Sequence, residues 1–200
     1  MRFVLVPGAG GSAWYWKLLA PLLGDAVAID LPADDETKGL PDYAALVRKA
    51  MNDSTVVVAQ SLGGFTAALV ADQAKALVFV NAMIPNPHET AGDWWANTGH
   101  VFPKDFTPEK YFLHDVPKDT LGPPRDEAKI VFRQRCDFDR WPDIPMNVIV
   151  GKDDRFFPPD FQRRVAKDRL GLDPIEIAGG HLVALSNPKG LADAILAFAC

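Results

Sequence analysis

A serine flanked by small residues directly follows an apolar run in the first third of the chain. Residues 55–59 are mostly β-branched and lead into Gln60-Ser61-Leu62-Gly63, after which alanine and leucine become frequent. A strand that turns sharply into a helix exposes the residue at its apex, and the small Ala59 and Gly63 leave room for that strained turn. The pattern predicts an exposed serine hydroxyl in a position to act as a nucleophile.

Two later apolar runs lead to an acid and to a histidine. Residues 146–150 precede Gly151 and the pair Asp153-Asp154, and residues 175–177 lead through two glycines to His181. A serine hydroxyl becomes a good nucleophile only when a base takes its proton, and a carboxylate orients that base. The chain order Ser, Asp, His is that of one known arrangement of such triads. The spacing therefore indicates a hydrolytic triad with one of the two aspartates as its acid.

Each of these residues also has a plainer interpretation. Ser61 is a suitable N-cap for the helix that follows it. Asp153 and Asp154 fit a polar turn, and Asp139 is a further possible acid. His181 could be a structural loop residue. The other histidines, His88, His100 and His114, lie in the polar middle third, where we expect them to be solvated, and no histidine is spaced for a metal site.

A second motif favours a different class of protein. Residues 8–13 read Gly-Ala-Gly-Gly-Ser-Ala between an apolar run and a possible helix, and Asp30 follows about twenty residues later. This is the spacing of a dinucleotide-binding fingerprint, with the acid placed for a ribose hydroxyl. Trp14 and Trp16, however, put bulky rings where a pyrophosphate needs clearance. An NAD-binding protein, or a binding protein without catalysis, stays an alternative.

Taken together, these motifs resemble those of the α/β-hydrolase family. Residues 4–16, with Pro7 where the family has His, resemble the strand and glycine turn that form the family's oxyanion hole, and Ala13-Trp14-Tyr15-Trp16 is similar to the branch of small serine esterases and hydroxynitrile lyases. The resemblance extends from about Phe3 to Phe198. Ala59, where the family has Gly, and Pro7 depart from the pattern, and neither removes a catalytic group.

The resemblance assigns roles to particular residues. It implies that Ser61, Asp154 and His181 form the triad, because Asp154 is the fourth residue of a Gly-x-x-Asp turn. It implies that the backbone N–H groups of Leu62 and Ala9, with Gly10 as second choice, bind the oxyanion. The expected reaction is hydrolysis of a small carboxylic ester without a cofactor or metal. A hydroxynitrile lyase, usually aided by a lysine near the pocket, and other cofactor-free chemistries of the fold stay open. Lys152 lies beside the acid turn, and we expect it to point away from the pocket.

The alternation of strands and helices predicts how these residues are positioned. We expect an α/β protein with a doubly wound, mainly parallel six-stranded sheet and helices on both faces, a minimal form of the fold. The expected strands are 2–6, 26–30, 55–60, 76–81, 145–151 and 174–178, and the expected helices are 14–23, 41–51, 62–73, 159–169 and 188–199. The candidate residues all follow strand ends, so they should meet at one edge of the sheet.

The segment 84–142 interrupts this alternation. It is rich in proline and aromatic residues, with one possible helix at about 125–136. An insertion of this length usually has a function, so within a single domain of residues 1–200 we expect a lid over Ser61. Its Trp94 and Trp95, together with Gly10, are expected to line the substrate pocket.

Composition narrows the possible partners. The 200 residues are 48% hydrophobic and 24% charged with a net charge of −5, which suits one globular domain and disfavours nucleic-acid binding. Cys136 and Cys200 are isolated and predict neither a disulfide framework nor a zinc site. With no evident signal peptide or membrane span, a cytoplasmic protein acting on a small molecule is the expectation. The oligomeric state is left open.

Overall fold

A six-stranded, fully parallel sheet forms the centre of the protein. The computed structural model describes residues 1–120 and 122–199. The strand order is β2-β1-β3-β4-β5-β6, and every neighbouring pair is parallel. The strands are β1 (Arg2–Val6), β2 (Ala26–Ala28), β3 (Thr55–Gln60), β4 (Ala76–Val80), β5 (Met146–Gly151) and β6 (Ile175–Ile177). The order reverses between β1 and β3, which is where sheets of this kind bind ligands. The predicted α/β fold class is thus confirmed.

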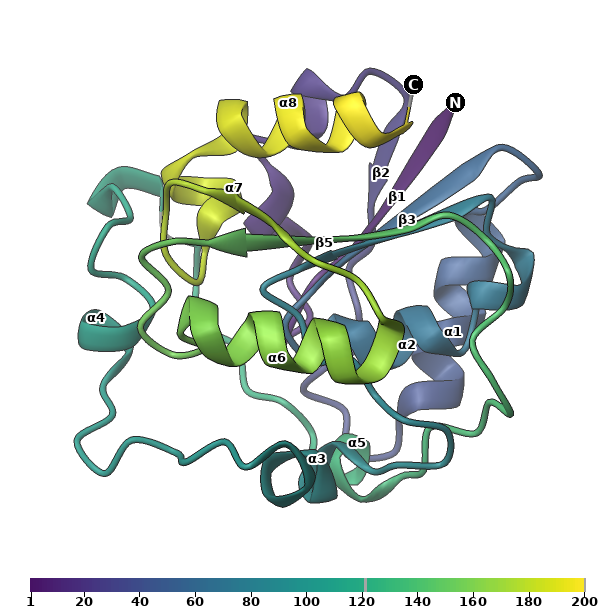
Figure 1. Ribbon diagram of the computed structural model, residues 1–200, viewed down its shortest axis with the longest axis horizontal. Helices are drawn as coiled ribbons and strands as arrows, with labels where there is room; N and C mark the ends of the chain where they lie inside the picture. The colour runs from purple at the N-terminus through teal and green to yellow at the C-terminus, as the bar shows by residue number, and fades with distance from the viewer. Residues whose placement is uncertain (121, 200) are drawn as a thin grey trace.

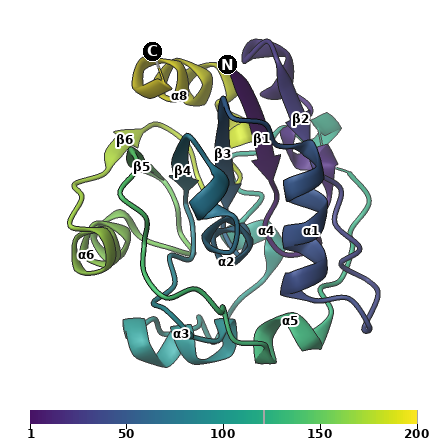
Figure 2. The same ribbon diagram turned by 90° about the vertical axis from the view of Figure 1, so that its right-hand side faces the viewer.

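Helices cover both faces of the sheet, as Figure 1 and Figure 2 show. One face packs against α1 (Leu40–Ala50), α2 (Gly63–Ala68) and α6 (Pro159–Leu170), and the other against α7 (Val183–Ser186), α8 (Pro188–Ala199) and two 3-10 turns, η1 (Ala13–Trp16) and η2 (Ala20–Leu22). Strand β1 illustrates why two cores form. Val4 and Val6 belong to the first core, whereas Phe3 and Leu5 belong to the second. Alternate side chains of a strand point to opposite faces, so strands buried on both faces are apolar throughout.

Two of the predicted helices differ from the structure. The helix expected over 14–23 is instead η1 and η2, and Pro21 stands in the first turn of η2. A proline lacks the N–H that a continuous helix needs. The helix expected over 62–73 ends at Ala68, and a separate 3-10 turn, η3 (Ala71–Gln73), follows.

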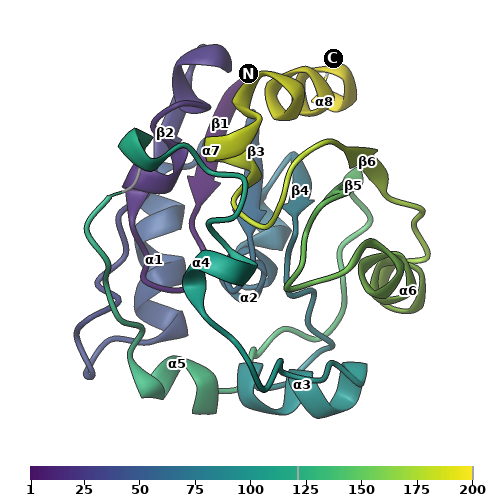
Figure 3. The ribbon, with the colours of Figure 1, turned by 90° about the vertical axis from the view of Figure 1, so that its left-hand side faces the viewer.

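The segment between β4 and β5 contains more helix than the sequence predicted. It forms α3 (Ala91–Thr98), α4 (Pro108–Tyr111), the 3-10 turn η4 (Lys118–Thr120) and α5 (Lys129–Arg133), so the helix expected over 125–136 is much shorter. Thr90 and Thr107 begin α3 and α4 with side-chain caps. Figure 1 shows α4 at the left, beyond the arrowhead of β5 and well away from α2, and Figure 3 shows α3 and α5 at the lower edge of the molecule.

Two remaining expectations concern membranes and cysteines. In the part of the chain that the structure describes, no helix is both long and apolar enough to cross a membrane. The Cys136 thiol is buried and donates to the carbonyl of Phe65 at 3.3 Å. Cys200 lies outside the described residues.

Candidate active site

The turn after β3 holds Ser61 in a strained conformation. Ser61 has a φ of 49°, a left-handed value that costs energy for a residue with a side chain. Its carbonyl accepts from Gly64 N at 3.1 Å and from Met83 N at 2.9 Å, which fixes the turn. Gly8, after β1, lies so close that a Cβ there would be 2.8 Å from the Ser61 Cβ. The two strand ends at the switch point of the sheet therefore bring the glycine turn against the serine.

Ser61, His181 and Asp154 lie within hydrogen-bond distance of one another. The Ser61 Oγ is 3.2 Å from His181 Nε2, and His181 Nδ1 is 2.8 Å from Asp154 Oδ2. They follow β3, β6 and β5, at the carboxyl ends of three strands. His181 and Asp154 are almost fully buried, while Ser61 keeps 9% of its surface exposed. The arrangement can transfer a proton from the hydroxyl to an imidazole whose charge a carboxylate then stabilises.

The structure separates the three aspartates that the sequence left as possible acids. Both oxygens of Asp154 have partners. Oδ1 accepts from Phe156 N and Phe157 N, each at 2.8 Å, and Oδ2 faces His181 Nδ1 at 2.8 Å. Asp153 Oδ2 instead accepts from Gly179 N at 3.0 Å and lies at the surface. Asp139 is exposed, 3.7 Å from the ring of His88. Of these three, Asp154 is the one that touches His181.

Buried amides hold the loops that carry the triad. Asn81 Nδ2 donates to the carbonyl of Gly180 at 2.9 Å, and its Oδ1 accepts from Gly151 N at 2.8 Å. Gln162 Nε2 donates to Asp154 Oδ2 at 3.2 Å. Asn81 directly follows β4 and has a φ of 45°, which asparagine tolerates better than most residues. The sequence analysis missed both residues, although the position of Asn81 at a strand end was a usable signal.

The segment between β4 and β5 contacts His181 directly. The ring of Phe112 stacks on the imidazole of His181, with centroids 4.8 Å apart and planes 22° apart. Asp115 Oδ2 accepts from Gly180 N, next to His181, at 2.6 Å. An aromatic face favours a cation above it, so Phe112 suits an imidazole that becomes charged. No sequence signal pointed to either residue.

Of the three predicted backbone donors, two are free to bind an oxyanion. Gly10 N donates to Glu127 Oε2 at 2.9 Å and is therefore occupied, which overturns the second choice made from the sequence. Across residues 1–120 and 122–199, the N–H groups of Ala9 and Leu62 have no acceptor. Leu62 stands immediately before α2, where N–H groups point outward from the helix start.

An apolar cavity of about 450 Å³ opens at the glycine turn, where Gly8 and Ala9 line it and Gly8 lies against Ser61. It is lined by Ala9, by Gln60 next to Ser61, and by Leu182 next to His181. The rest of its wall is largely apolar and comes from Trp14, Tyr15, Pro108, Leu113, Pro123, Pro124 and Leu185. This is the composition expected of a pocket for a small organic substrate.

Comparison with known proteins identifies the family of this chain. The model of the alpha/beta hydrolase family matches residues 3–194. This chain belongs to that family. Solved structures agree in fold: the polyneuridine aldehyde esterase structure has a TM-score of 0.82 at 22% identity, covering 100% of this chain and 99% of that one.

Sequence relatives of this α/β hydrolase include a lyase and an esterase. The α-hydroxynitrile lyase of Arabidopsis thaliana is 25% identical, over 99% of this chain and 96% of that protein. Methylesterase 7 of Arabidopsis thaliana is 28% identical, over 99% of this chain and 96% of that protein. The expected resemblance to esterases and hydroxynitrile lyases is confirmed.

The structure places neither predicted tryptophan on the cavity. Trp94 is fully buried, its indole N–H donates to the carbonyl of Ile84 at 3.0 Å, and its ring packs against Phe157. Trp95 packs on Phe156 and His100. Neither residue lines the cavity beside Ser61, and neither does Gly10. None of the three residues predicted for the pocket lines this cavity, and for the two tryptophans the reason is that the path of an irregular segment cannot be inferred from its composition.

The remaining histidines are less exposed than predicted. His100 Nε2 lies 2.7 Å from the carbonyl of Phe156, and burial lowers the pKa of His100 below its ordinary value of 6.5. His114 keeps only 10% of its side chain exposed. His88 is partly exposed at 43% and faces Asp137, which comes nearer to the prediction. In the described residues, no group of three or more His, Cys, Asp or Glu could hold a metal ion.

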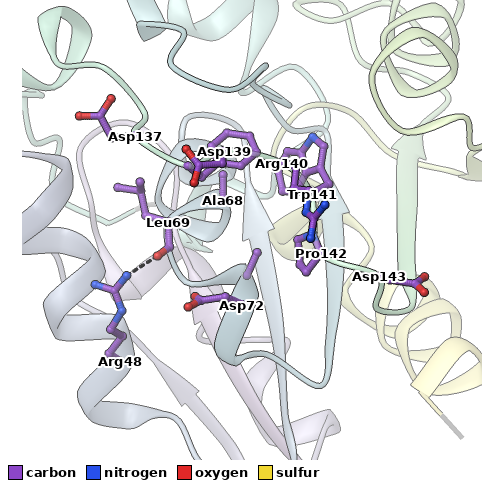
Figure 4. Close-up of a pocket in the computed structure, with 12 residues that line it drawn as sticks. Arg48, Ala68, Leu69, Asp72, Asp137, Asp139, Arg140, Trp141, Pro142 and Asp143 are labelled. Atoms are coloured by element: carbon purple, nitrogen blue, oxygen red, sulfur yellow. Dashed lines mark hydrogen bonds between the residues drawn. The ribbon is translucent and has the colours of Figure 1, made fainter.

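Two other pockets lie away from the serine. A pocket of about 830 Å³, shown in Figure 4, is lined by charged residues, among them Arg48 of α1, Asp72 of η3 and Asp139 of the loop before β5. It contains no member of the triad. The second of these pockets, of about 410 Å³, reaches Asp154 from the side of Lys152 and His114. Lys152 thus stands on the carboxylate side of the triad and does not line the apolar cavity.

The structure contradicts the dinucleotide-binding alternative. The glycine turn leads into the four-residue 3-10 turn η1, so it does not present the N-terminus of an α-helix to a pyrophosphate. Asp30, the expected ribose ligand, is engaged by the guanidinium of Arg125 at 3.0 Å and by Ala13 N at 2.9 Å. Positive charge from Arg125 and these hydrogen bonds outweigh desolvation and lower the pKa of Asp30.

Proposed function

We propose that this α/β hydrolase is a serine esterase that cleaves small carboxylic esters through an acyl-enzyme. The observation that carries the proposal is the continuous path from Ser61 Oγ through His181 to Asp154, at 3.2 Å and 2.8 Å. Hydrolases and esterases among its relatives support the same reaction class.

The reaction would proceed in two halves. Ser61 Oγ attacks the ester carbonyl while His181 Nε2 takes the hydroxyl proton, and Asp154 stabilises the imidazolium. The N–H groups of Ala9 and Leu62 bind the negative oxygen, each contributing roughly 10²–10³ in rate. His181 then protonates the departing alkoxide. In the second half, a water molecule loses its proton to His181, attacks the acyl group, and releases the acid and Ser61.

The segment between β4 and β5 is proposed to act as a lid within the same domain. Pro108, Leu113, Pro123 and Pro124 from this segment form one wall of the cavity, and Phe112 covers the imidazole. A lid of this kind excludes water from the acyl-enzyme and sets the size of the acyl or alcohol group that fits.

A panel of p-nitrophenyl esters of graded acyl length tests the proposal. The wild type should hydrolyse short esters, with kcat/KM falling once the acyl group exceeds the cavity, and it should react with a fluorophosphonate probe. Ser61→Ala should lose both signals while keeping the circular dichroism spectrum of the wild type. Hydrolysis that survives in Ser61→Ala would refute the proposal.

A second candidate is cleavage of hydroxynitriles by the same residues. The relationship to the α-hydroxynitrile lyase of Arabidopsis thaliana favours it. In that case His181 would remove the hydroxyl proton of the substrate and cyanide would leave. Cyanide release from mandelonitrile distinguishes the two reactions, and its absence alongside ester hydrolysis excludes the lyase.

A further inference from the structure

Two charged side chains grip one peptide segment of the glycine turn. Glu127 Oε2 accepts from Gly10 N at 2.9 Å, and Arg125 Nε donates to the carbonyl of Gly10 at 2.6 Å. Both come from the segment between β4 and β5, more than a hundred residues along the chain. Gly10 is thus held through both of its backbone polar groups.

Each gripping side chain is itself anchored to another part of the fold. The Tyr43 hydroxyl, on α1, donates to Glu127 Oε1 at 2.7 Å. The guanidinium of Arg125 donates two further bonds to Asp30, at 3.0 Å and 3.1 Å. Because Tyr43 and Asp30 already fix these side chains, binding Gly10 costs them little further conformational freedom, and the network can hold the backbone of Gly10 in one conformation.

The backbone at this point needs such a constraint. Gly10 and Gly11 have φ values of 83° and 60°, a region where glycine is freely mobile between several conformations. The peptide unit that carries Gly10 N directly follows the one that carries Ala9 N. The two units share the Cα of Ala9, so a displacement of the turn that releases Gly10 from Glu127 and Arg125 also moves the Ala9 N–H relative to the oxyanion.

We propose that Glu127 and Arg125 are positioning residues, which hold Gly10 so that the Ala9 N–H faces the oxyanion formed on Ser61. This inference rests on the esterase proposal and deepens it. Both side chains bind the backbone of Gly10 and act through it.

The charge of Glu127 gives the proposal a readout of its own. Burial raises the pKa of Glu127 to about 7, against hydrogen bonds from Tyr43 and Gly10 and the positive charge of Arg125, all of which lower it. These three are the groups that face the carboxyl. Glu127 is therefore an anion above this pH and a neutral acid below it, and an anion is the stronger acceptor.

The experiment compares Glu127→Gln and Glu127→Ala with the wild type on one p-nitrophenyl ester between pH 5.5 and 8.5. The glutamine cannot ionise, so the ratio of wild-type kcat to Glu127→Gln kcat should rise through pH 7, from near one to about 5-fold. Glu127→Ala should lose up to roughly 10² in kcat, the effect of one misplaced oxyanion donor, with KM changed less than about 2-fold.

Glu36→Ala is the matched control. Glu36 Oε2 accepts from Lys129 N at 3.1 Å, so this variant also removes a carboxylate that holds the same segment, but it does not touch Gly10. It should leave kcat unchanged. A general loosening of the segment would instead lower kcat in both alanine variants.

An NMR measurement separates this proposal from the esterase proposal. The amide proton of Gly10 should shift with an apparent pKa near 7 in the wild type and show no such shift in Glu127→Gln. A flat kcat ratio, or a Gly10 amide insensitive to pH, would overturn the positioning role even where Glu127→Ala fails to fold. A wild type without esterase activity would refute the esterase proposal and this role with it, while the Gly10 signal would still report whether the contact exists.

Discussion

Replacing Asp154 by asparagine should abolish most of the esterase activity, because it changes the tautomer of His181. Asp154 Oδ1 accepts two backbone N–H groups, whereas Oδ2 faces His181 Nδ1 at 2.8 Å. In Asp154→Asn the amide oxygen must occupy the Oδ1 position, because two donors already point there. The amide NH₂ then faces His181 Nδ1, which has to become an acceptor. Its proton moves to Nε2, facing Ser61, and the base is lost.

The magnitude follows from the loss of that base. Substitutions that impose the wrong histidine tautomer lower kcat by about 10⁴, which corresponds to roughly 5.4 kcal/mol in the barrier. The fold should survive, because the Oδ1 bonds to Phe156 N and Phe157 N are kept. The new NH₂ also faces Gln162 Nε2, so a modest fall in melting temperature is expected.

Asp153→Asn is the control within the same turn. Asp153 accepts one bond, from Gly179 N, and an amide oxygen can accept it equally well. Its kcat should stay within about 3-fold of the wild type, as for most surface substitutions. Steady-state kinetics on p-nitrophenyl acetate would measure both variants. The reasoning fails if Asp154→Asn keeps more than a tenth of the wild-type kcat.

Three further outcomes are expected. Phe112→Ala should lower kcat about 10-fold, because it removes the ring stacked on the His181 imidazolium, whereas Phe102→Ala, at an exposed site without that contact, should have no effect on the same assay. Glu127→Gln should be more stable than the wild type above pH 7, by up to roughly 3 kcal/mol in the free energy of unfolding, and equally stable near pH 4. The reason is that a carboxyl whose pKa rises from 4.5 to about 7 on folding contributes stability at low pH that is lost as the pH rises through 7. Urea titration at both pH values measures the difference. Trp94→Ala should cost about 3–5 kcal/mol in thermal or urea unfolding, and an altered acyl-length preference in that variant would contradict its place in the core.

The sequence predicted those parts of the fold that depend on local patterns. The strands of the parallel sheet are mostly apolar, and their ends supply Ser61, Asp154 and His181, so both the strand positions and the proximity of the three side chains could be inferred. Asn81 could have been found by the same rule, since it follows β4 directly. Helix ends were less predictable: Pro21 stands where the helix expected over 14–23 divides into η1 and η2, and α2 ends at Ala68, before η3.

The residues that adjust the site could not be predicted, because they reach it through tertiary contacts of an irregular segment. At the site, Phe112, Asp115 and Glu127 contact His181, Gly180 and Gly10, which lie far from them in sequence. Their positions depend on the path of some sixty residues between β4 and β5. Glu127 shows what such contacts can cost. A carboxylate whose pKa is raised by burial destabilises the folded protein above pH 7, yet it holds the backbone of Gly10 next to the oxyanion site. A buried charge that opposes folding at working pH is easier to understand as a component of the active site than as a component of the core.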